Sequence, residues 1–384
     1  MYMEKILHRY NLWWGGEVEF TYNPREIFPE IWNTISDNKI TVLTGLRRVG
    51  KTTLMKMVIA ALIKQKTDPT RILYVSLDNI AFLDIGISDI VEEFRKINRI
   101  PFKEKVYLFL DEAGYKKDYE IELKNLFDMG NVKIFVSSSS TSILKSKVPY
   151  ITGRTKTINV LPLNFKEFLD FREIKIKSED AGLYKSYFED YLKIGGLPEY
   201  VLTEDAGILT ELIEQVIYKD VIAFHQIKEG KTVLELFRLL CERVGKPFTY
   251  NKLSKVLGTS PESIKRYITY FEDAYLFYTI ERYARSLNER VYSPKKVYVG
   301  DVGLRNVTVG FKDKGSLYEN LVFLKIKDKK PGYYYKAGVE LDFVFEDTLL
   351  ECKYGGELTK KQEELLNKSK MKKIIARGCE FFMD

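Results

Sequence analysis

The chain has 384 residues, a formal net charge of +7, and 45% hydrophobic and 30% charged residues. This length predicts two or three domains, and the composition is typical of a globular protein. No stretch approaches the roughly 20 apolar residues of a membrane span, and no secretory signal is recognisable, so we expect no membrane partner. The three widely spaced cysteines form no CxxC pair, which argues against a disulfide framework and favours a cytoplasmic protein.

Apolar strands alternate with helical patterns through the first 165 residues. Strands are expected at 39–45, 71–77, 105–110 and 132–136, and helices at 51–65 and 87–97. Continuous apolar strands that alternate with helices indicate a parallel sheet covered on both faces. The predicted fold class is therefore α/β, with a domain at 1–165 built on a parallel sheet.

A glycine-rich segment, Gly45-Leu-Arg-Arg-Val-Gly50-Lys51-Thr52, joins the first strand to the first helix and matches the P-loop pattern. The glycines permit a tight turn whose N–H groups point at phosphate oxygens. Lys51 would reach the β/γ-phosphates, and the Thr52 hydroxyl would bind Mg²⁺. The sequence predicts binding of ATP or ADP with Mg²⁺ through Gly45, Arg48, Gly50, Lys51, Thr52 and Thr53.

Two acids follow the strand at 105–110, in the arrangement called Walker B. Asp111 would hold Mg²⁺, mostly through water, and Glu112 would polarise the water that attacks the γ-phosphate. A pair of solvated acids at a strand end is the alternative interpretation. The P-loop upstream favours the catalytic one.

The run Ser137-Ser-Ser-Ser-Thr-Ser142 follows the fourth strand, and Arg154 comes shortly after it. A hydroxyl of this run, from Ser137 or Ser139, would act as a sensor between Walker B and the γ-phosphate. The guanidinium of Arg154 would stabilise transition-state charge, on its own subunit or on a neighbour. An ordinary serine-rich loop and a surface arginine explain these residues equally well.

The middle of the chain reads as a helical lid at 166–228 followed by a winged helix at 229–300. Ser260 and a proline after it begin a helix in the manner of a recognition helix. Its polar residues Ser263, Lys265 and Arg266 would face a DNA groove or phosphates. A lid or a partner-docking module with an ordinary basic face is the alternative.

Residues 301–384 return to an αβ pattern and hold a second set of charged residues. Glu319 lies on an expected helix, Asp342 and Glu351 lie on successive strands, and Lys353 shares a face with Glu351. This order resembles the restriction-endonuclease-like PD-(D/E)xK fold. The resemblance implies a second divalent metal on the acids and a lysine that orients or deprotonates water. A salt-bridged hairpin and a fold that binds DNA without cutting it are the alternatives.

Several motifs together resemble the archaeal and bacterial AAA+ ATPases of the AAA_14 type, which carry a C-terminal DUF4143 region. The resemblance covers nearly the whole chain and implies an AAA+ ATPase with a nuclease-like C-terminal module. One departure is Asp111-Glu-Ala-Gly114, where the group usually has Asp-Glu-x-Gln. The motifs are the P-loop run 43–54, the strand 107–112, Ser-Ser-Ser with Thr-Gly-Arg after it, and the segments 161–169, 191–200, 218–220 and 296–304.

The leading hypothesis is an ATPase that remodels or repairs a DNA-associated complex, with double-stranded or branched DNA as partner. One rival is a nucleotide-dependent switch or scaffold that recruits a protein partner and has an inactive nuclease fold. Another is a metal-dependent nuclease gated by ATP. The charge of +7 is compatible with a polyanionic partner, and a homo-oligomer is consistent with AAA+ behaviour. ATP turnover with and without DNA distinguishes these hypotheses.

Overall fold

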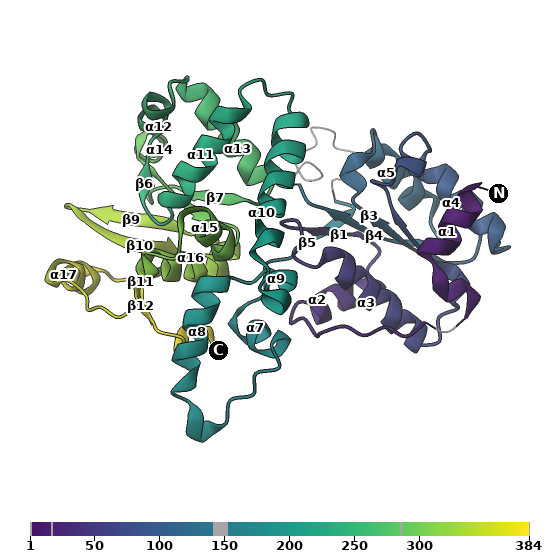
Figure 1. The fold of residues 1–384 in the computed structure, drawn as a ribbon, viewed down its shortest axis with the longest axis horizontal. Helices are drawn as coiled ribbons and strands as arrows, with labels where there is room; N and C mark the ends of the chain where they lie inside the picture. The colour runs from purple at the N-terminus through teal and green to yellow at the C-terminus, as the bar shows by residue number, and fades with distance from the viewer. Residues whose placement is uncertain (1, 17, 141–152, 285, 384) are drawn as a thin grey trace. The chain divides into compact units, whose positions relative to one another are not determined.

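The structure is a computed structural model that describes residues 2–16, 18–140, 153–284 and 286–383 (Figure 1). The chain divides into two compact units, Met1–Val160 and Leu161–Asp384. The first unit is close to the domain predicted at 1–165. The finer division of the rest into lid, winged helix and nuclease-like domain stays a prediction.

The first unit is built on a five-stranded sheet in the order β2-β3-β4-β1-β5. All of its neighbouring strands are parallel, which confirms the predicted α/β class. The strand β5 was not predicted, because its sequence Thr-Lys-Thr-Ile-Asn is not an apolar run and the strand is only partly buried. The strands are β1 (Ile40–Thr44), β2 (Ile72–Ser76), β3 (Val106–Asp111), β4 (Val132–Ser138) and β5 (Thr155–Asn159).

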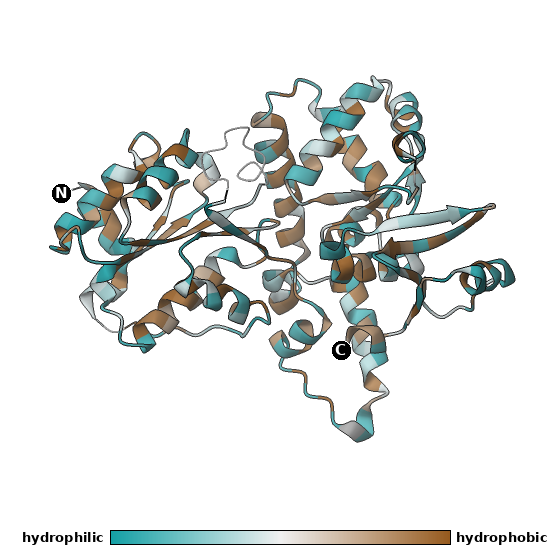
Figure 2. Ribbon diagram, turned by 180° about the vertical axis from the view of Figure 1, so that it is seen from behind, coloured by the Kyte–Doolittle hydropathy of each residue, from teal (hydrophilic) through white to brown (hydrophobic). Residues whose placement is uncertain are grey.

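Helices cover both faces of this sheet. Figure 1 shows α2 and α3 on one face and α1, α4 and α5 on the other, and Figure 2 shows hydrophobic residues along the strands between them. Asn11 fastens the N-terminal segment to edge strand β2: its side chain accepts from Tyr74 N (2.6 Å) and donates to Tyr74 O (2.9 Å). The helices are α1 (Tyr2–Tyr10), α2 (Phe28–Asn33), α3 (Lys51–Lys64), α4 (Ile87–Ile97) and α5 (Tyr119–Met129).

The second unit begins with helices, as predicted. A capping box of Asn164 and Glu167 starts α7, and a long helix changes from α-helical to π-helical hydrogen bonding at Gln215. The Gly-Gly-Leu-Pro break separates α8 from α9, at the predicted place. The elements are α7 (Phe165–Phe171), α8 (Leu183–Ile194), α9 (Pro198–Thr203), α10 (Ala206–Glu214) and the π-helix η8 (Gln215–Ala223).

The described residues next form four helices and a three-stranded antiparallel sheet of order β6-β8-β7. The helices occupy the predicted region. The strands were not predicted, because they are short and a long connection separates β7 from β8. The elements are α11 (Gly230–Glu242), β6 (Pro247–Phe248), α12 (Tyr250–Leu257), α13 (Pro261–Asp273), β7 (Phe277–Ile280), α14 (Leu287–Tyr292) and β8 (Lys295–Val299).

The last part of the chain has the predicted αβ pattern. Its four-stranded sheet has the order β12-β11-β10-β9, with β9, β10 and β11 antiparallel and β12 parallel to β11. The elements are α15 (Val302–Val309), α16 (Lys314–Ile326), β9 (Gly332–Lys336), β10 (Val339–Phe345), β11 (Thr348–Lys353), α17 (Lys360–Lys368) and β12 (Lys372–Arg377).

A buried carboxylate joins two of the motifs noticed in the sequence. Asp301, 2% exposed, accepts hydrogen bonds from Gly196 N (2.7 Å) and Gly303 N (2.8 Å). Gly303 has to be glycine, because a Cβ there would lie 2.1 Å from Ile194 O. The segments 191–200 and 296–304 are therefore packed and hydrogen-bonded against each other.

The variant Asp301→Asn should destabilise the second unit. One amide oxygen cannot replace both carboxylate oxygens, so a buried N–H loses its acceptor, at a cost of about 1–3 kcal/mol. Denaturant unfolding at neutral pH measures the change. The matched control is Asp205→Asn, since exposed Asp205 caps α10 through Gly207 N (2.8 Å) and should lose under about 1 kcal/mol. Equal losses in the two variants would contradict the special role of Asp301.

Candidate nucleotide-binding site

The P-loop connects the carboxyl end of β1 to the first residue of α3. A Cβ on Gly45 would lie 2.2 Å from Val160 O, and Gly50 has a φ of +96°, so both positions require glycine. Arg48 also has a positive φ, of 62°. Lys51 is 5% exposed, and its ammonium donates to Gly45 O (2.9 Å) and Leu46 O (3.0 Å). The buried ammonium of Lys51 is thus held by backbone oxygens at the start of the P-loop.

Asp111 is the centre of the site. It ends β3, is 3% exposed, and its Oδ2 accepts hydrogen bonds from Thr52 Oγ1 (2.6 Å) and Tyr74 OH (2.8 Å). The Ser137 hydroxyl donates to its other oxygen. The two residues predicted to hold Mg²⁺, Thr52 and Asp111, are therefore in direct contact, and a carboxylate and a hydroxyl are hard oxygen ligands of the kind that Mg²⁺ prefers. The donor set fits the ion.

Glu112 lies beside Asp111 in an unusual backbone conformation, with a φ of 51°. Strain of this kind is commonly found at functional sites. Its backbone N–H donates to Ser137 Oγ (2.9 Å), and its carboxylate accepts from Ser139 Oγ (3.1 Å). Burial raises the pKa of Glu112, and the positive charge of Lys51 opposes that rise. The structure brings the predicted base and both predicted sensor serines together.

The strand order explains this convergence. Because β4 lies between β1 and β3, its carboxyl end carries Ser137 and Ser139 to the space between the P-loop and Walker B. Thr53, also predicted to bind nucleotide, is exposed in the first turn of α3. Thr141 and Ser142, the end of the serine-rich run, lie outside the described residues.

Arg154 is not at this site. It precedes β5 at the amino end of the sheet, where its backbone oxygen accepts from Ile40 N (2.8 Å). The P-loop follows the other end of β1, a strand length of about 16 Å away. The Arg154 side chain pairs with Asp128, Nε to Oδ1 3.1 Å. The prediction that Arg154 acts on the nucleotide of its own chain is therefore wrong, and action on a neighbouring subunit stays a prediction.

Three residues at the site were not predicted. Tyr74 on β2 donates to Asp111, and Arg25 donates to Val49 O (2.8 Å) in the P-loop. Arg47 donates to the hydroxyl of Tyr115, and its positive charge opposes the rise that burial causes in the pKa of Glu112. Tyr74 resembles an ordinary core residue of an apolar strand. Arg25 lies outside any motif, so no sequence signal identifies it. Arg47 lies within the P-loop run, but at a position where the P-loop pattern specifies no residue type.

The charged residues predicted in the C-terminal region do come together. Asp342 N donates to Glu351 Oε2 (3.1 Å), and Lys353 Nζ lies 2.8 Å from Glu351 Oε1. The centre of this cluster, however, is Lys296 of β8, which is 1% exposed. Its ammonium lies 2.7 Å from Glu319, 3.0 Å from Glu340 and 3.5 Å from Asp342.

The ammonium of Lys296 supplies the positive charge that the nuclease hypothesis assigned to a bound metal ion. Burial raises the pKa of Glu319 to about 8 and that of Glu351 to about 7, and the charge of Asp342 adds to both rises. Among the described residues, no group of three or more His, Cys, Asp or Glu side chains is placed to hold a metal ion. The structure therefore does not support the second divalent metal.

Two parts of the chain match known domain families. Residues 37–169 match an AAA domain family, AAA_14, and residues 185–315 match a domain of unknown function, DUF8612. The first match supports an AAA-type ATPase domain around the site described above. The second differs from the DUF4143 region suggested by the sequence motifs, which is not confirmed. In the described part of the chain no helix is long and apolar enough to cross a membrane.

The similar curated proteins have no described function. An uncharacterized protein of Methanocaldococcus jannaschii, MJ1544, is 29% identical over 352 residues, 85% of this chain and 77% of the relative. An uncharacterized protein of Haemophilus influenzae is 25% identical over 362 residues, 88% of this chain and 89% of the relative.

Two solved structures of ATPases show distant likeness to the chain. The ADP complex of Hsp104 from S. cerevisiae has a TM-score of 0.35 and 18% identity, over 67% of this chain and 50% of that one. AMPPCP-bound DnaA from Aquifex aeolicus has a TM-score of 0.30 and 16% identity, over 66% of this chain and 89% of that one. The AAA domain match and the site geometry support the ATPase assignment.

The variant Glu112→Gln should bind MgATP with normal affinity and turn it over about 100-fold more slowly, because it loses the group that polarises water. The matched control is Glu30→Gln, an exposed carboxylate on α2. Because burial raises the pKa of Glu112, wild-type turnover should fall on acidification at a higher pH than an ordinary glutamate would cause. Wild-type turnover in Glu112→Gln, or loss of nucleotide affinity, would contradict the assigned role.

The variant Lys296→Met should lower the free energy of unfolding by about 3–5 kcal/mol, because it leaves buried carboxylates without a counter-charge. The loss should shrink as pH falls, since protonation of Glu319 and its neighbours removes their repulsion. Denaturant unfolding at several pH values measures both effects. Lys295→Met is the control: Lys295 pairs with half-exposed Glu281 at 2.6 Å and should lose under about 1 kcal/mol. A pH-independent loss in Lys296→Met would contradict the account.

Proposed function

We propose that the chain is an ATPase that hydrolyses MgATP at its P-loop and acts on a DNA-associated complex. The observation that carries the ATPase proposal is the contact of Thr52, Tyr74 and Ser137 with one buried carboxylate, Asp111, beside the P-loop lysine. A surface pair of acids would not be held by three hydroxyls from three different elements.

Each residue has a distinct task in this proposal. The N–H groups of the loop and Lys51 bind the phosphates, while Thr52 and Asp111 hold Mg²⁺, which when bound neutralises charge on the phosphates. The Glu112 carboxylate accepts a hydrogen bond from the attacking water and thereby polarises that water. Ser139 orients the Glu112 carboxylate, and Ser137 joins the Glu112 backbone to Asp111. Lys51 and Arg47 favour the ionised form of Glu112 that this role requires.

The DNA part of the proposal rests on the region from α11 to β8. The helices α11, α12 and α13 and the three-stranded antiparallel sheet support the winged-helix assignment. Ser260 caps α13 through Ser263 N (3.0 Å), and Lys265 and Arg266 are exposed on that helix. These two cations are available to DNA phosphates. Arg154 enters the proposal as a residue that acts on a neighbouring subunit of a homo-oligomer.

A nucleotide-dependent switch that recruits a protein partner is the second candidate. The observation that favours it is Lys296, whose ammonium already neutralises the acids that a nuclease would use for metal. The C-terminal region would then be a fold of nuclease-like shape without cleavage activity. DNA cleavage is not part of either proposal.

ATP turnover of wild type and of Lys51→Ala, each with and without DNA, tests the proposal. Lys51→Ala should abolish hydrolysis, because it removes the cation that reaches the β/γ-phosphates. Lys64→Ala, which removes an exposed lysine at the end of α3, is the matched control. Turnover of wild type that rises with DNA supports the DNA-associated ATPase, whereas indifference to DNA favours the switch. Hydrolysis by Lys51→Ala at the wild-type rate would refute the ATPase site.

A further inference from the structure

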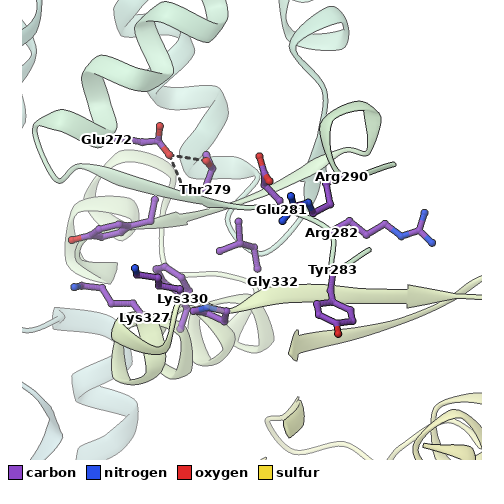
Figure 3. A pocket seen from close by; sticks show the side chains of 13 residues that line it. Glu272, Thr279, Glu281, Arg282, Tyr283, Arg290, Lys327, Lys330 and Gly332 are labelled. Carbon is purple, nitrogen blue, oxygen red and sulfur yellow. Dashed lines mark hydrogen bonds between the residues drawn. The ribbon is translucent and has the colours of Figure 1, made fainter. Parts of the chain in front are cut away.

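A pocket of about 480 Å³ lies where the chain leaving β7 meets the start of β9 (Figure 3). Two backbone hydrogen bonds join the segments there, from Tyr283 N to Tyr333 O (2.8 Å) and from Tyr333 N to Glu281 O (3.0 Å). Gly332 completes the junction, since a Cβ there would lie 2.9 Å from Glu281 O. The walls are therefore tied to two sheets, and the pocket volume falls in the range of ligand sites.

The acids that line this pocket already have partners. Glu272 Oε1 accepts from Thr279 N (3.1 Å) and Thr279 Oγ1 (2.6 Å), as Figure 3 shows. Glu281 pairs with Lys295 at 2.6 Å. Both carboxylates are thereby held by groups on the chain itself. They are not left to attract a cationic ligand.

Four cations line the pocket, and two of them have an acidic partner. Arg282 pairs with Glu289 (3.0 Å), and Lys327 pairs with Asp328 (3.0 Å). Among the described residues, the side chains of Arg290 and Lys330 have neither a hydrogen bond nor an ion pair, and both are exposed. The buried Nε of Arg282 also has no hydrogen-bond partner there. The charge still available in the pocket is therefore positive.

The cations lie at two ends of the pocket, with an aromatic side chain beside one end. Figure 3 shows Lys327 and Lys330 on one side and Arg282, Arg290 and Tyr283 on the other. Tyr283 is 49% exposed, and its ring lies 6.3 Å from that of Tyr334, between ring centroids, at an angle of 35°. Separate basic groups suit a ligand with more than one phosphate, and an exposed ring suits a flat base.

We propose that this pocket binds a single strand of nucleic acid, with phosphates at Lys330 and at Arg290 and one base stacked on Tyr283. A duplex is a poor fit, because its bases are stacked inside and cannot reach the tyrosine. The inference deepens the proposed DNA-associated function and rests on it for the identity of the partner, but the binding itself can be measured without ATP.

Fluorescence anisotropy of a labelled oligonucleotide of about 12 residues, with the full chain at several salt concentrations, tests the proposal. Arg290→Ala with Lys330→Ala should weaken binding at least about tenfold and reduce the salt slope by about 1.4, because each cation that no longer neutralises a phosphate of a single strand lowers the slope by about 0.7. Tyr283→Ala should weaken binding about tenfold with little change of slope. The control, Lys360→Ala with Lys361→Ala, removes two exposed lysines from α17 and should leave binding unchanged.

Three results would overturn the proposal. One is equal affinity of the double pocket variant and the α17 control. Another is a duplex that binds as tightly as the single strand with the same dependence on Arg290 and Lys330. The third is displacement of the strand by AMP at an equal concentration, which would identify a nucleotide pocket. Basal ATPase activity separates this proposal from the previous one: the pocket variants should retain it, and Lys51→Ala should lose it while still binding the strand.

Discussion

The first unit depends on the solvation of one buried carboxylate. Asp111 is almost wholly removed from water, and an ionised group in that position is costly unless hydrogen bonds replace its hydration. The hydroxyls of Thr52, Tyr74 and Ser137 provide those bonds from α3, β2 and β4. Burial and the nearby carboxylate raise the pKa of Tyr74, so its hydroxyl stays protonated and remains a donor. The same contacts that stabilise Asp111 hold the P-loop helix against the Walker B strand.

In the second unit, carboxylates removed from water are stabilised by a buried ammonium in place of hydroxyl groups. Glu319, Glu340 and Asp342 surround the ammonium of Lys296, and Tyr298 OH donates to Glu319 (2.7 Å). A lysine on β8 thus ties the three-stranded sheet to the four-stranded one. At the P-loop, the hydroxyl of Thr52 and the carboxylate of Asp111 are oxygen ligands of the kind that Mg²⁺ prefers, and among the described residues no side-chain ammonium or guanidinium forms an ion pair with Asp111. In the second cluster the chain carries its own cation, which is why acids in the order of a nuclease do not by themselves indicate a metal.

How much could be predicted from the sequence depended on whether the signal was local. The P-loop, Asp111 and Glu112 can be recognised from short runs of consecutive residues. The alternation of side chains along a strand correctly predicted that Glu351 and Lys353 share one face. Lys296 and Tyr74 were missed because each acts on residues distant in sequence, and each lies on a strand whose pattern suggests only burial. The sequence left open whether Arg154 acts on its own subunit or on a neighbour, because its distance along the chain from the P-loop does not show which end of the sheet it occupies. The strands β5, β6 and β7 were missed because they are short or polar and give little periodic signal, whereas β8 was missed although most of it is buried.

The position of Val160 gives the P-loop a direct contact with the end of the first unit. Val160 N donates to Thr44 O (2.7 Å), and the absence of a side chain on Gly45 lets Val160 O approach the P-loop. The next residue, Leu161, begins the second unit. The P-loop therefore lies directly against Val160, the last residue of the first unit. Gly45 is required twice, for the turn around the phosphates and for this contact, so a larger residue there would disturb nucleotide binding and the exit of the chain together.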